Sequence, residues 1–381
     1  MRELQLLIKP VSSACDLDCR YCFYKDEAAN RAVGDHGKMR KETMRAVVDK
    51  ALAASQTCVF GFQGGEPTLA GLSFFEDFTA YVEEKRRPGQ EVSYSIQTNG
   101  CGLDERWFTF LKEKRFLVGL SLDGVRRTHD ENRRDRKGEG TFSRVFDCAV
   151  QLRERGIPFN VLCVLNAQTA PRAGAIYRFF LRKGFVWQQY IPCLDPLEEQ
   201  RGKAAFSLTP KLYGEALKEL FGLWFQDKAA GRPVYIRQFD NYLSMLQGGQ
   251  PEACSMYGRC SMQNVVESDG TVYPCDFYAL DAWQMGNIRD EETDFEILYR
   301  WSCGEEPGKN KETAPFFREP DRRDDRCPAC RWYPLCRGGC RRDCFAVPRG
   351  GMRNYYCETY QRFFADNISR LEYLAARGRE G

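Results

Sequence analysis

The sequence predicts an α/β fold: a partial (β/α)6, TIM-like barrel followed by a cysteine-rich domain. Two observations lead to this prediction. From residue 1 to about residue 230, short β-rich runs alternate with amphipathic stretches, which is typical of a parallel sheet with crossover helices. Eighteen cysteines stand among 381 residues, and in a reducing compartment clustered cysteines indicate metal or redox sites.

The barrel prediction depends on hydrophobic periodicity. Strands are predicted at residues 4–8, 58–62, 92–97, 117–122, 159–165 and 186–191, and helices at 41–54, 73–85, 105–114, 142–155 and 172–183. In the last helix but one, apolar residues recur at helical spacing, Thr141 is placed to cap the start, and Gly156 with Pro158 ends it. Ligands of such a fold bind at the carboxyl ends of the strands.

The rest of the chain differs in character. Residues 210–246 are predicted to be helical, apart from a break near residues 231–233. Residues 247–360 are rich in Cys, Gly, Pro and Arg and poor in long periodic runs, so this segment needs staples to fold. We therefore predict a barrel domain over 1–235, a cysteine-rich domain over 236–365, and a C-terminal helix and tail over 366–381.

Charge and histidine content narrow the classes of function. Lys and Arg number 56 against 53 Asp and Glu, a net charge of +3, so we expect neither a nucleic-acid nor a membrane partner. No apolar run approaches transmembrane length, and the run at 4–8 is too short for a signal peptide, so the expected location is cytoplasmic. A disulfide scaffold would be small and secreted. With only two histidines, His36 and His129, iron–sulfur centres are favoured over mixed Cys/His zinc sites.

The first chemical motif is Cys15-x3-Cys19-x2-Cys22, with Tyr21 just before the third cysteine. Three thiolates this close can share one soft metal centre, and three ligands on a four-iron cluster leave one iron open. The alternative is a zinc knuckle, but zinc takes four ligands and no fourth cysteine or histidine lies nearby. The loop resembles the signature of radical S-adenosylmethionine enzymes. That resemblance implies that the open iron chelates S-adenosylmethionine, whose reductive cleavage gives a 5'-deoxyadenosyl radical.

Polar residues just past the predicted strand ends extend the resemblance. The Gly-Gly-Glu-Pro stretch at residues 64–67 looks like the family's GGEP motif, which holds the methionine amino group. Paired glycines let backbone approach a ligand closely, although they are also common in plain turns. The resemblance assigns cofactor binding to Tyr21, Gly64, Gly65, Glu66, Ser121, Arg133 and Leu194. Arg134 and Arg136 compete with Arg133 for the cofactor carboxylate.

The cysteine-rich segment resembles the SPASM extension of the same family. It contains a C-x-x-C-x5-C-x3-C run from Cys327 and a C-x(9–15)-G-x4-C element from Cys260. The resemblance implies two auxiliary four-iron clusters, the first held by Cys254, Cys260, Cys275 and Cys340, the second by Cys327, Cys330, Cys336 and Cys357. Cys344 lies between two of these ligands and competes with them, and C-x-x-C pairs also serve zinc. The remaining cysteines are expected mostly in the core: Cys58, Cys101, Cys148, Cys163, Cys193 and Cys303.

One aspartate separates the possible chemistries. Asp276 directly follows the predicted ligand Cys275, which looks like the anaerobic sulfatase-maturating enzymes, where the matching aspartate is the general base. The alternative is a turn or surface carboxylate. The implied reaction oxidises a cysteine or serine in an unfolded sulfatase peptide, within a C/S-x-P/A-x-R motif, to Cα-formylglycine. The predicted substrate contacts are Tyr24, Gln63 and Gln97.

The resemblance also predicts what the chain binds. The expected cofactors are S-adenosylmethionine and three [4Fe-4S] clusters, and the expected partners are the sulfatase polypeptide and a flavodoxin- or ferredoxin-type electron donor. The chain itself is expected to be a monomer. Two rival functions stay open. One is a peptide maturase that forms thioether cross-links, for which Cys15 begins too early to leave room for the usual N-terminal recognition domain. The other is a zinc-stapled interaction protein.

Overall fold

The structure is a computed structural model that describes residues 3–303, 316–317, 323–348 and 351–377. The fold is α/β with a mostly parallel sheet. The chain divides into two compact units that interleave along the sequence. Unit 1 consists of Met1–Leu122, Arg133–Phe159 and Ser261–Phe317, and unit 2 of Asp123–Asn132, Asn160–Cys260 and Arg318–Gly381.

Unit 1 is built on parallel strands that pair in chain order. They are β1 (Glu3–Ile8), β2 (Thr57–Phe62), β3 (Glu91–Thr98) and β4 (Leu117–Ser121). Each agrees with a predicted strand to within one residue at either end, because short apolar runs between turn residues specify buried strands well. On the other edge, β1 pairs in parallel with β8 (Val265–Val266), which pairs antiparallel with β9 (Val272–Tyr273). The pairings of β8 and β9 were not predicted. Together they place the segment that precedes Asp276 at the edge of the sheet beside β1.

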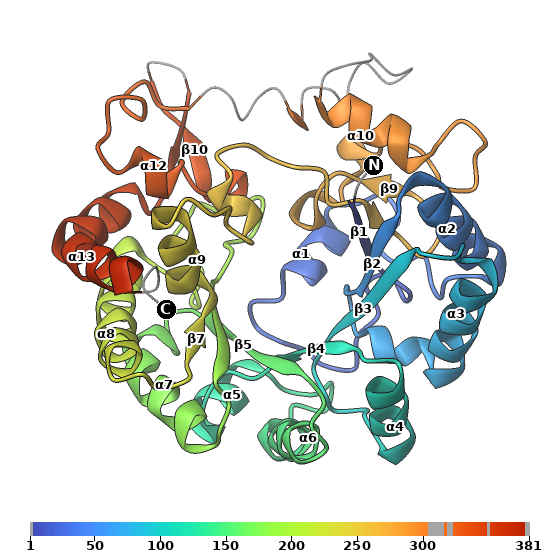
Figure 1. The fold of residues 1–381 in the computed structure, drawn as a ribbon, viewed down its shortest axis with the longest axis horizontal. Coiled ribbons are helices and arrows are strands. Elements are labelled where there is room, and N and C mark those ends of the chain that lie inside the picture. The colour runs from blue at the N-terminus through green and yellow to red at the C-terminus, as the bar shows by residue number, and fades with distance from the viewer. Residues whose placement is uncertain (1–2, 304–315, 318–322, 349–350, 378–381) are drawn as a thin grey trace. The chain divides into compact units, whose positions relative to one another are not determined.

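The helices of unit 1 follow the strands as predicted. They are α2 (Lys41–Ala54), α3 (Leu72–Lys85), α4 (Glu105–Glu113) and α6 (Phe142–Glu154), whereas α10 (Phe295–Cys303) was not predicted. In Figure 1, α2, α3 and α4 lie on the same side of the unit 1 strands. Packed aromatic rings fill the interface, and Phe62 and Phe78 meet edge to face at 5.0 Å. One further helix, α1 (Phe23–Ala29), was not predicted, because seven residues are too few for a clear periodic signal.

Unit 2 has its own parallel strands and a helical layer. The strands are β5 (Phe159–Leu165, from Asn160 on in this unit), β6 (Trp187–Pro192) and β7 (Tyr235–Ile236). The helices are α5 (Arg126–Asn132), α7 (Ala173–Arg182), α8 (Pro210–Ala229), α9 (Arg237–Leu246), α12 (Tyr333–Cys336) and α13 (Cys357–Arg377). A short antiparallel pair, β10 (Cys344–Ala346) and β11 (Met352–Asn354), follows α12. The helices at 210–246 confirm the prediction, whereas β7 and α5 were not predicted.

The C-terminal helix α13 starts earlier than predicted. It begins at Cys357 rather than at residue 366, because its apolar face already includes Phe363, which stacks on Phe239 of α9 at 5.8 Å. The predicted domain boundaries after residues 235 and 365 stay predictions, since the two compact units interleave along the chain.

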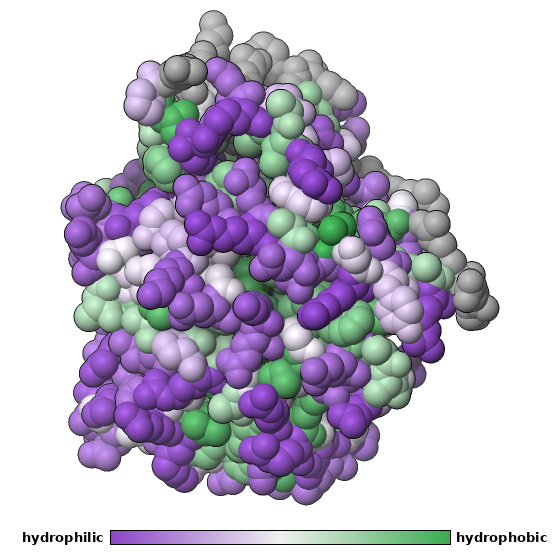
Figure 2. Space-filling model, turned by 90° about the vertical axis from the view of Figure 1, so that its left-hand side faces the viewer, coloured by the Kyte–Doolittle hydropathy of each residue, from purple (hydrophilic) through white to green (hydrophobic). Residues whose placement is uncertain are grey.

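Hydrophilic side chains predominate on the face seen in Figure 2. None of the helices in the described part of the chain combines the length and apolar character needed to cross a membrane.

Candidate active site

The cysteine loop lies directly after β1 and is held by backbone bonds from two other loops of unit 1. The Asp18 amide donates to the Arg134 carbonyl at 2.7 Å, and the Glu66 amide donates to the Ala14 carbonyl at 2.8 Å. Cys15, Cys19 and Cys22 are half-buried free thiols, so they have the exposure that a cluster with an exchangeable ligand requires. These donors fit the predicted three-thiolate site.

The glycines after β2 have a clear steric reason. Gly65 has a φ of +54°, and a Cβ there would lie 2.2 Å from the Ala14 carbonyl oxygen. Gly64 has a φ of +103°, and a Cβ there would lie 2.6 Å from Cε of Lys9. Side chains at these positions would therefore collide with the cysteine loop and with a buried lysine. The sequence suggested close approach to a ligand, and the structure shows close approach to the protein.

Glu66 is buried and surrounded by donors. Its carboxylate accepts from the Thr98 hydroxyl at 2.7 Å and from the Asn99 amide at 2.7 Å, and the Thr68 hydroxyl adds a third bond at 2.7 Å. Burial raises the pKa of Glu66, although these donors oppose the shift. The Asn99 side chain donates to Asp16 of the cysteine loop at 2.7 Å. The ends of β1, β2 and β3 are thus joined into one polar edge.

The side chain of Arg133 lies beside the cysteine loop, whereas the side chains of its two competitors are exposed. Arg133 is buried, its guanidinium lies 5.4 Å from the Tyr21 ring centroid, and Nη1 lies 3.9 Å from Cys19 Sγ. Arg134 and Arg136 are exposed. Ser121 is buried at the end of β4, and Gln97 is half-buried on β3. Leu194 is half-buried after β6 in unit 2, so its predicted cofactor contact stays a prediction.

Asp276, Tyr24 and Gln63 meet in unit 1, and the strand pairing explains why. The Tyr24 hydroxyl donates to Asp276 Oδ2 at 2.7 Å, and Gln63 Nε2 donates to the same oxygen at 3.0 Å. The Asp276 amide donates to Gln263 Oε1 at 2.8 Å. Asp276 is 4% exposed, and its Oδ1 is buried with no hydrogen-bond partner among the described residues. Burial raises the pKa of Asp276, and the nearby Lys9 opposes that shift.

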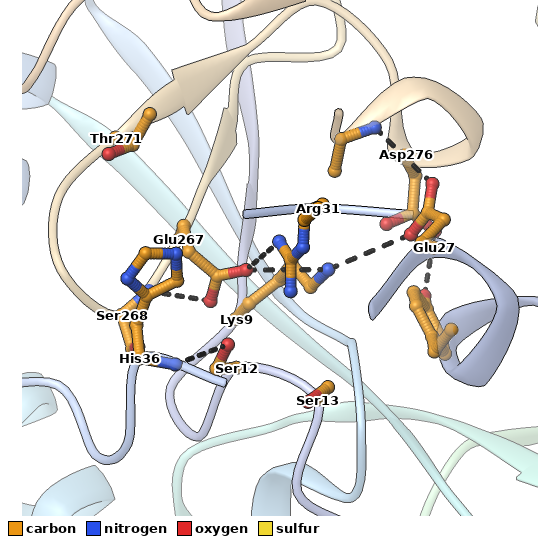
Figure 3. A network of polar contacts seen from close by, with 12 residues as sticks. Lys9, Ser12, Ser13, Glu27, Arg31, His36, Glu267, Ser268, Thr271 and Asp276 are labelled. Carbon is orange, nitrogen blue, oxygen red and sulfur yellow. Dashed lines mark hydrogen bonds and ion pairs between the residues drawn. The ribbon is translucent and has the colours of Figure 1, made fainter. Parts of the chain in front are cut away.

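A buried charge network adjoins this group, and it was not predicted. Figure 3 shows Lys9, Glu27, Arg31 and Glu267 pointing toward one another, with Asp276 beside Glu27. Arg31 Nη1 lies 2.8 Å from Glu267 Oε2, and Lys9 Nζ lies 3.6 Å from the same oxygen. Charged residues are usually exposed, and none of these four was among the predicted site residues. The available signal was a lysine directly after a buried strand, at the edge where ligands bind.

The second auxiliary set of cysteines is gathered within unit 2. Burial raises the pKa of the Cys336 thiol to about 11, and the negative charges of Cys357, Cys327 and Cys330 add to the shift. The Cys330 amide donates to the Cys327 carbonyl at 3.0 Å. These half-buried thiols lie close enough to repel one another when ionised, and they fit a shared cluster.

The first auxiliary set is divided between the units, since Cys275 belongs to unit 1 and Cys254, Cys260 and Cys340 belong to unit 2. Its assembly stays a prediction. The competitor Cys344 is buried, and its thiol donates to the Cys340 carbonyl at 3.2 Å. Among the described residues, no three Cys, His, Asp or Glu side chains are arranged to hold a single metal ion. Of the spare cysteines, the buried ones are Cys58, Cys148, Cys163 and Cys193; Cys101 is half-buried and Cys303 is exposed.

Comparison with known families agrees with these two regions. The Radical SAM superfamily matches residues 10–180, and the SPASM family, described as an iron-sulfur cluster-binding domain, matches residues 254–337. The first match covers the cysteine loop, the loop after β2 and Arg133. The second contains all but two of the predicted auxiliary ligands, Cys340 and Cys357.

Individual relatives cover nearly the whole chain. A "Cysteine-type anaerobic sulfatase-maturating enzyme" of Clostridium novyi (strain NT) is 43% identical over 377 residues, 98% of each chain. A "Serine-type anaerobic sulfatase-maturating enzyme" of Bacteroides thetaiotaomicron is 28% identical over 98% of this chain and 91% of the relative. The solved structure "Native anSMEcpe with bound AdoMet and Cp18Cys peptide" superposes with a TM-score of 0.90 at 40% identity, covering 98% of this chain and 99% of that one.

A more distant structure shares the fold alone. Streptococcus suis SuiB bound to the precursor peptide SuiA superposes with a TM-score of 0.59 at 17% identity, covering 90% of this chain and 72% of that one. At this identity the similarity carries no information about the reaction.

Proposed function

This chain belongs to the family of anaerobic sulfatase-maturating enzymes, and we propose that it oxidises a cysteine of a sulfatase polypeptide to Cα-formylglycine. Cysteine is preferred over serine because the cysteine-type relatives are 43–44% identical and the serine-type relatives 27–28%. The substrate segment is an unfolded peptide with a C-x-P-x-R motif. The match to an iron-sulfur cluster-binding domain argues against the rival function of a zinc-stapled interaction protein.

The residues that hold the cofactors follow from the site. Cys15, Cys19 and Cys22 hold the cluster that binds S-adenosylmethionine, with Glu66 and Arg133 beside it. The buried position of Arg133 over Tyr21 supports its role as the partner of the cofactor carboxylate. When bound and reduced, cluster and cofactor supply the radical that removes a hydrogen atom from the substrate β-carbon.

Asp276 takes the proton. Its Oδ2 is occupied by Tyr24 and Gln63, while its buried Oδ1 is left open as an acceptor, and this observation carries the assignment. The substrate loses a hydrogen atom, a proton to Asp276 and one electron; the cysteines of the auxiliary sets would hold clusters able to accept that electron. The resulting thioaldehyde is hydrolysed to the aldehyde and hydrogen sulfide. A flavodoxin- or ferredoxin-type protein supplies the reducing electron.

The test uses the reconstituted full chain, S-adenosylmethionine, a reductant and a C-x-P-x-R peptide under anaerobic conditions. We expect the wild-type protein to form formylglycine, detected by mass spectrometry. Asp276→Asn should lower formylglycine formation by about a hundred-fold or more, because the proton acceptor is lost, while 5'-deoxyadenosine is still produced.

The matched control is Asp49→Asn. Asp49 is an exposed carboxylate on α2 that also accepts from a tyrosine, Tyr81, at 3.1 Å. It should leave turnover unchanged. Unchanged turnover in Asp276→Asn would remove the assignment of the base.

A further inference from the structure

Lys9 is a fully buried cation whose position is set by strand pairing. It directly follows β1 and is 1% exposed. In the β1–β8 register Ile8 is opposite Val266, and the Lys9 amide donates to the Val266 carbonyl at 2.9 Å. Lys9 and Glu267 therefore leave the paired strands side by side. Its Nζ lies 3.6 Å from Glu267 Oε2 and 3.9 Å from Glu27 Oε2.

The charges around Lys9 are unequal in number. Two cations, Lys9 and Arg31, face the three buried carboxylates Glu27, Glu267 and Asp276 (Figure 3). Glu267 forms ion pairs with both cations and accepts a hydrogen bond from the Ser268 amide. Its pKa is therefore lowered, although burial opposes this shift. Oε2 of Glu27 accepts no hydrogen bond from the described residues, and it forms an ion pair with Lys9. Leaving the Lys9 ammonium unpaired at this depth would be costly. Its contact with Glu27 therefore also helps to fix its position.

Lys9 also contacts the tyrosine that donates to Asp276. Its Nζ lies 4.9 Å from the Tyr24 ring centroid, within the range of an attractive cation–π contact. Tyr24 and Glu27 are three residues apart on α1 and so lie on the same face of that helix. Lys9 thereby contacts two side chains on the same face of α1.

The aliphatic part of Lys9 is fixed by the loop after β2. A Cβ at Gly64 would lie 2.6 Å from Lys9 Cε and 2.7 Å from Cγ. The stem thus fills the space that a side chain at position 64 would need. Gln63, the second donor to Asp276, immediately precedes this contact.

The geometry points to Lys9 as a positioning residue: through the Tyr24 ring and Glu27 it fixes the phenol that donates to Asp276. This inference rests on the proposed function and adds to it. We expect Lys9 to act on the reaction chiefly through Tyr24, so its effect should depend on the presence of the Tyr24 hydroxyl.

The first experiment is Lys9→Met, which keeps most of the stem and removes the charge. In the anaerobically reconstituted full chain with a C-x-P-x-R peptide, kcat should fall by about ten- to a hundred-fold, because a misplaced catalytic group costs that much. KM for the peptide should change by less than about threefold. More 5'-deoxyadenosine should form per formylglycine, and iron content should be unchanged. Lys9→Arg, which restores the charge, should recover part of kcat.

The matched control is Lys85→Met. Lys85 is exposed and lies 5.4 Å over the Tyr81 ring on α3, so it repeats the lysine–tyrosine contact away from the site. It should leave kcat unchanged. Lys9→Met with wild-type kcat, or with kcat lost only in proportion to lost iron, would overturn the inference.

A double-mutant cycle separates positioning from charge balance. Adding Lys9→Met to Tyr24→Phe should change kcat by less than about twofold, because the hydroxyl through which Lys9 acts is already gone. Additive effects would overturn the inference. The pair Lys9→Met with Glu27→Gln removes the cation together with a carboxyl group that it faces. Recovery of wild-type kcat in this pair would show that Lys9 only balances that carboxyl, and would overturn its positioning role. Wild-type turnover in Asp276→Asn would instead remove the base, whatever the outcome of this cycle.

Discussion

Glu27 is a carboxyl group in a place where its charged form is costly. It is 2% exposed, and the one hydrogen bond that Oε1 accepts from the described residues comes from the Ala279 amide, at 3.3 Å. Burial raises the pKa of Glu27 to about 8; Lys9 opposes the shift and the charge of Asp276 adds to it. The folded chain therefore binds a proton at Glu27 more tightly than the unfolded chain does.

This shift predicts how stability depends on pH. An unfolded glutamate has a pKa of about 4.3, so between about pH 4.3 and about pH 8 the folded chain binds more protons at this site than the unfolded chain. Stability is thus lost as the pH rises through this window. Glu27→Gln should remove this loss and become more stable relative to wild type as the pH increases.

Thermal unfolding of the cluster-loaded protein at several pH values between about 5 and about 8 measures this difference. Glu83→Gln, on the exposed side of α3, serves as control because its difference from wild type should not vary with pH. A constant difference for Glu27→Gln would contradict the prediction.

At the scale of elements, α1 links Cys22, a predicted cluster ligand, to the surroundings of Asp276, the proposed proton acceptor. Cys22 directly precedes the helix, and Tyr24 and Glu27 lie within its first five residues. Contacts between α1 and the segment after β9 are made by Phe23 and Phe277, whose rings meet edge to face at 5.0 Å. Ligation of the third cysteine and placement of the phenol are thus set by the same short helix.

The strands and longer helices could be predicted because each contains its own pattern. The apolar run at β2 and the helical spacing in α6 are local, and their predicted bounds agree with the structure. The cysteine ligands and Asp276 were proposed from motif spacing and from the resemblance, and their roles stay predictions. Lys9 and Glu267 could not be predicted, because their burial depends on the β1–β8 pairing, which joins residues far apart in sequence and carries little local signal in two-residue strands.

Thr141 shows a local prediction that tertiary structure overrides. The sequence places it as the cap of α6, but its side chain makes no capping bond. Its hydroxyl donates instead to the Arg133 carbonyl at 3.0 Å. The start of α6 therefore anchors the loop that carries Arg133 beside the cysteines.

Thr141→Val should therefore loosen that loop more than the helix. Removing the hydroxyl at constant shape leaves a buried carbonyl without this donor, which costs about 1 to 2 kcal/mol of unfolding free energy. Amide exchange should accelerate in residues 133–140, with little change at the start of α6. Thr141→Ser keeps the hydroxyl and should behave as wild type. Faster exchange confined to α6 would show that Thr141 acts as a cap after all.

At the scale of the whole molecule, the two units depend on iron to different degrees. Unit 1 has a sheet with a packed aromatic core, in which Phe60, Phe62 and Phe78 lie in contact. In unit 2, α8, α9 and α13 pack through Phe221, Phe239 and Phe363. The described residues between 323 and 356 have only α12, β10, β11 and one 3₁₀ turn, Arg341–Asp343, so thiolate–metal bonds are expected to hold this segment.

Iron removal should therefore act first on the second auxiliary set. Mild oxidation with an iron chelator should lower amide protection in the described residues of 323–357 by about a hundred-fold or more, since metal binding and local folding are one equilibrium there. β2 and β3 should keep their protection, because their hydrogen bonds and aromatic core need no metal. Cys336→Ser should reproduce the local effect with iron present at the other sites, whereas Cys303→Ser, which removes an exposed spare thiol, should not. Equal loss of protection in β2 would show that the sheet of unit 1 also depends on the clusters for its stability.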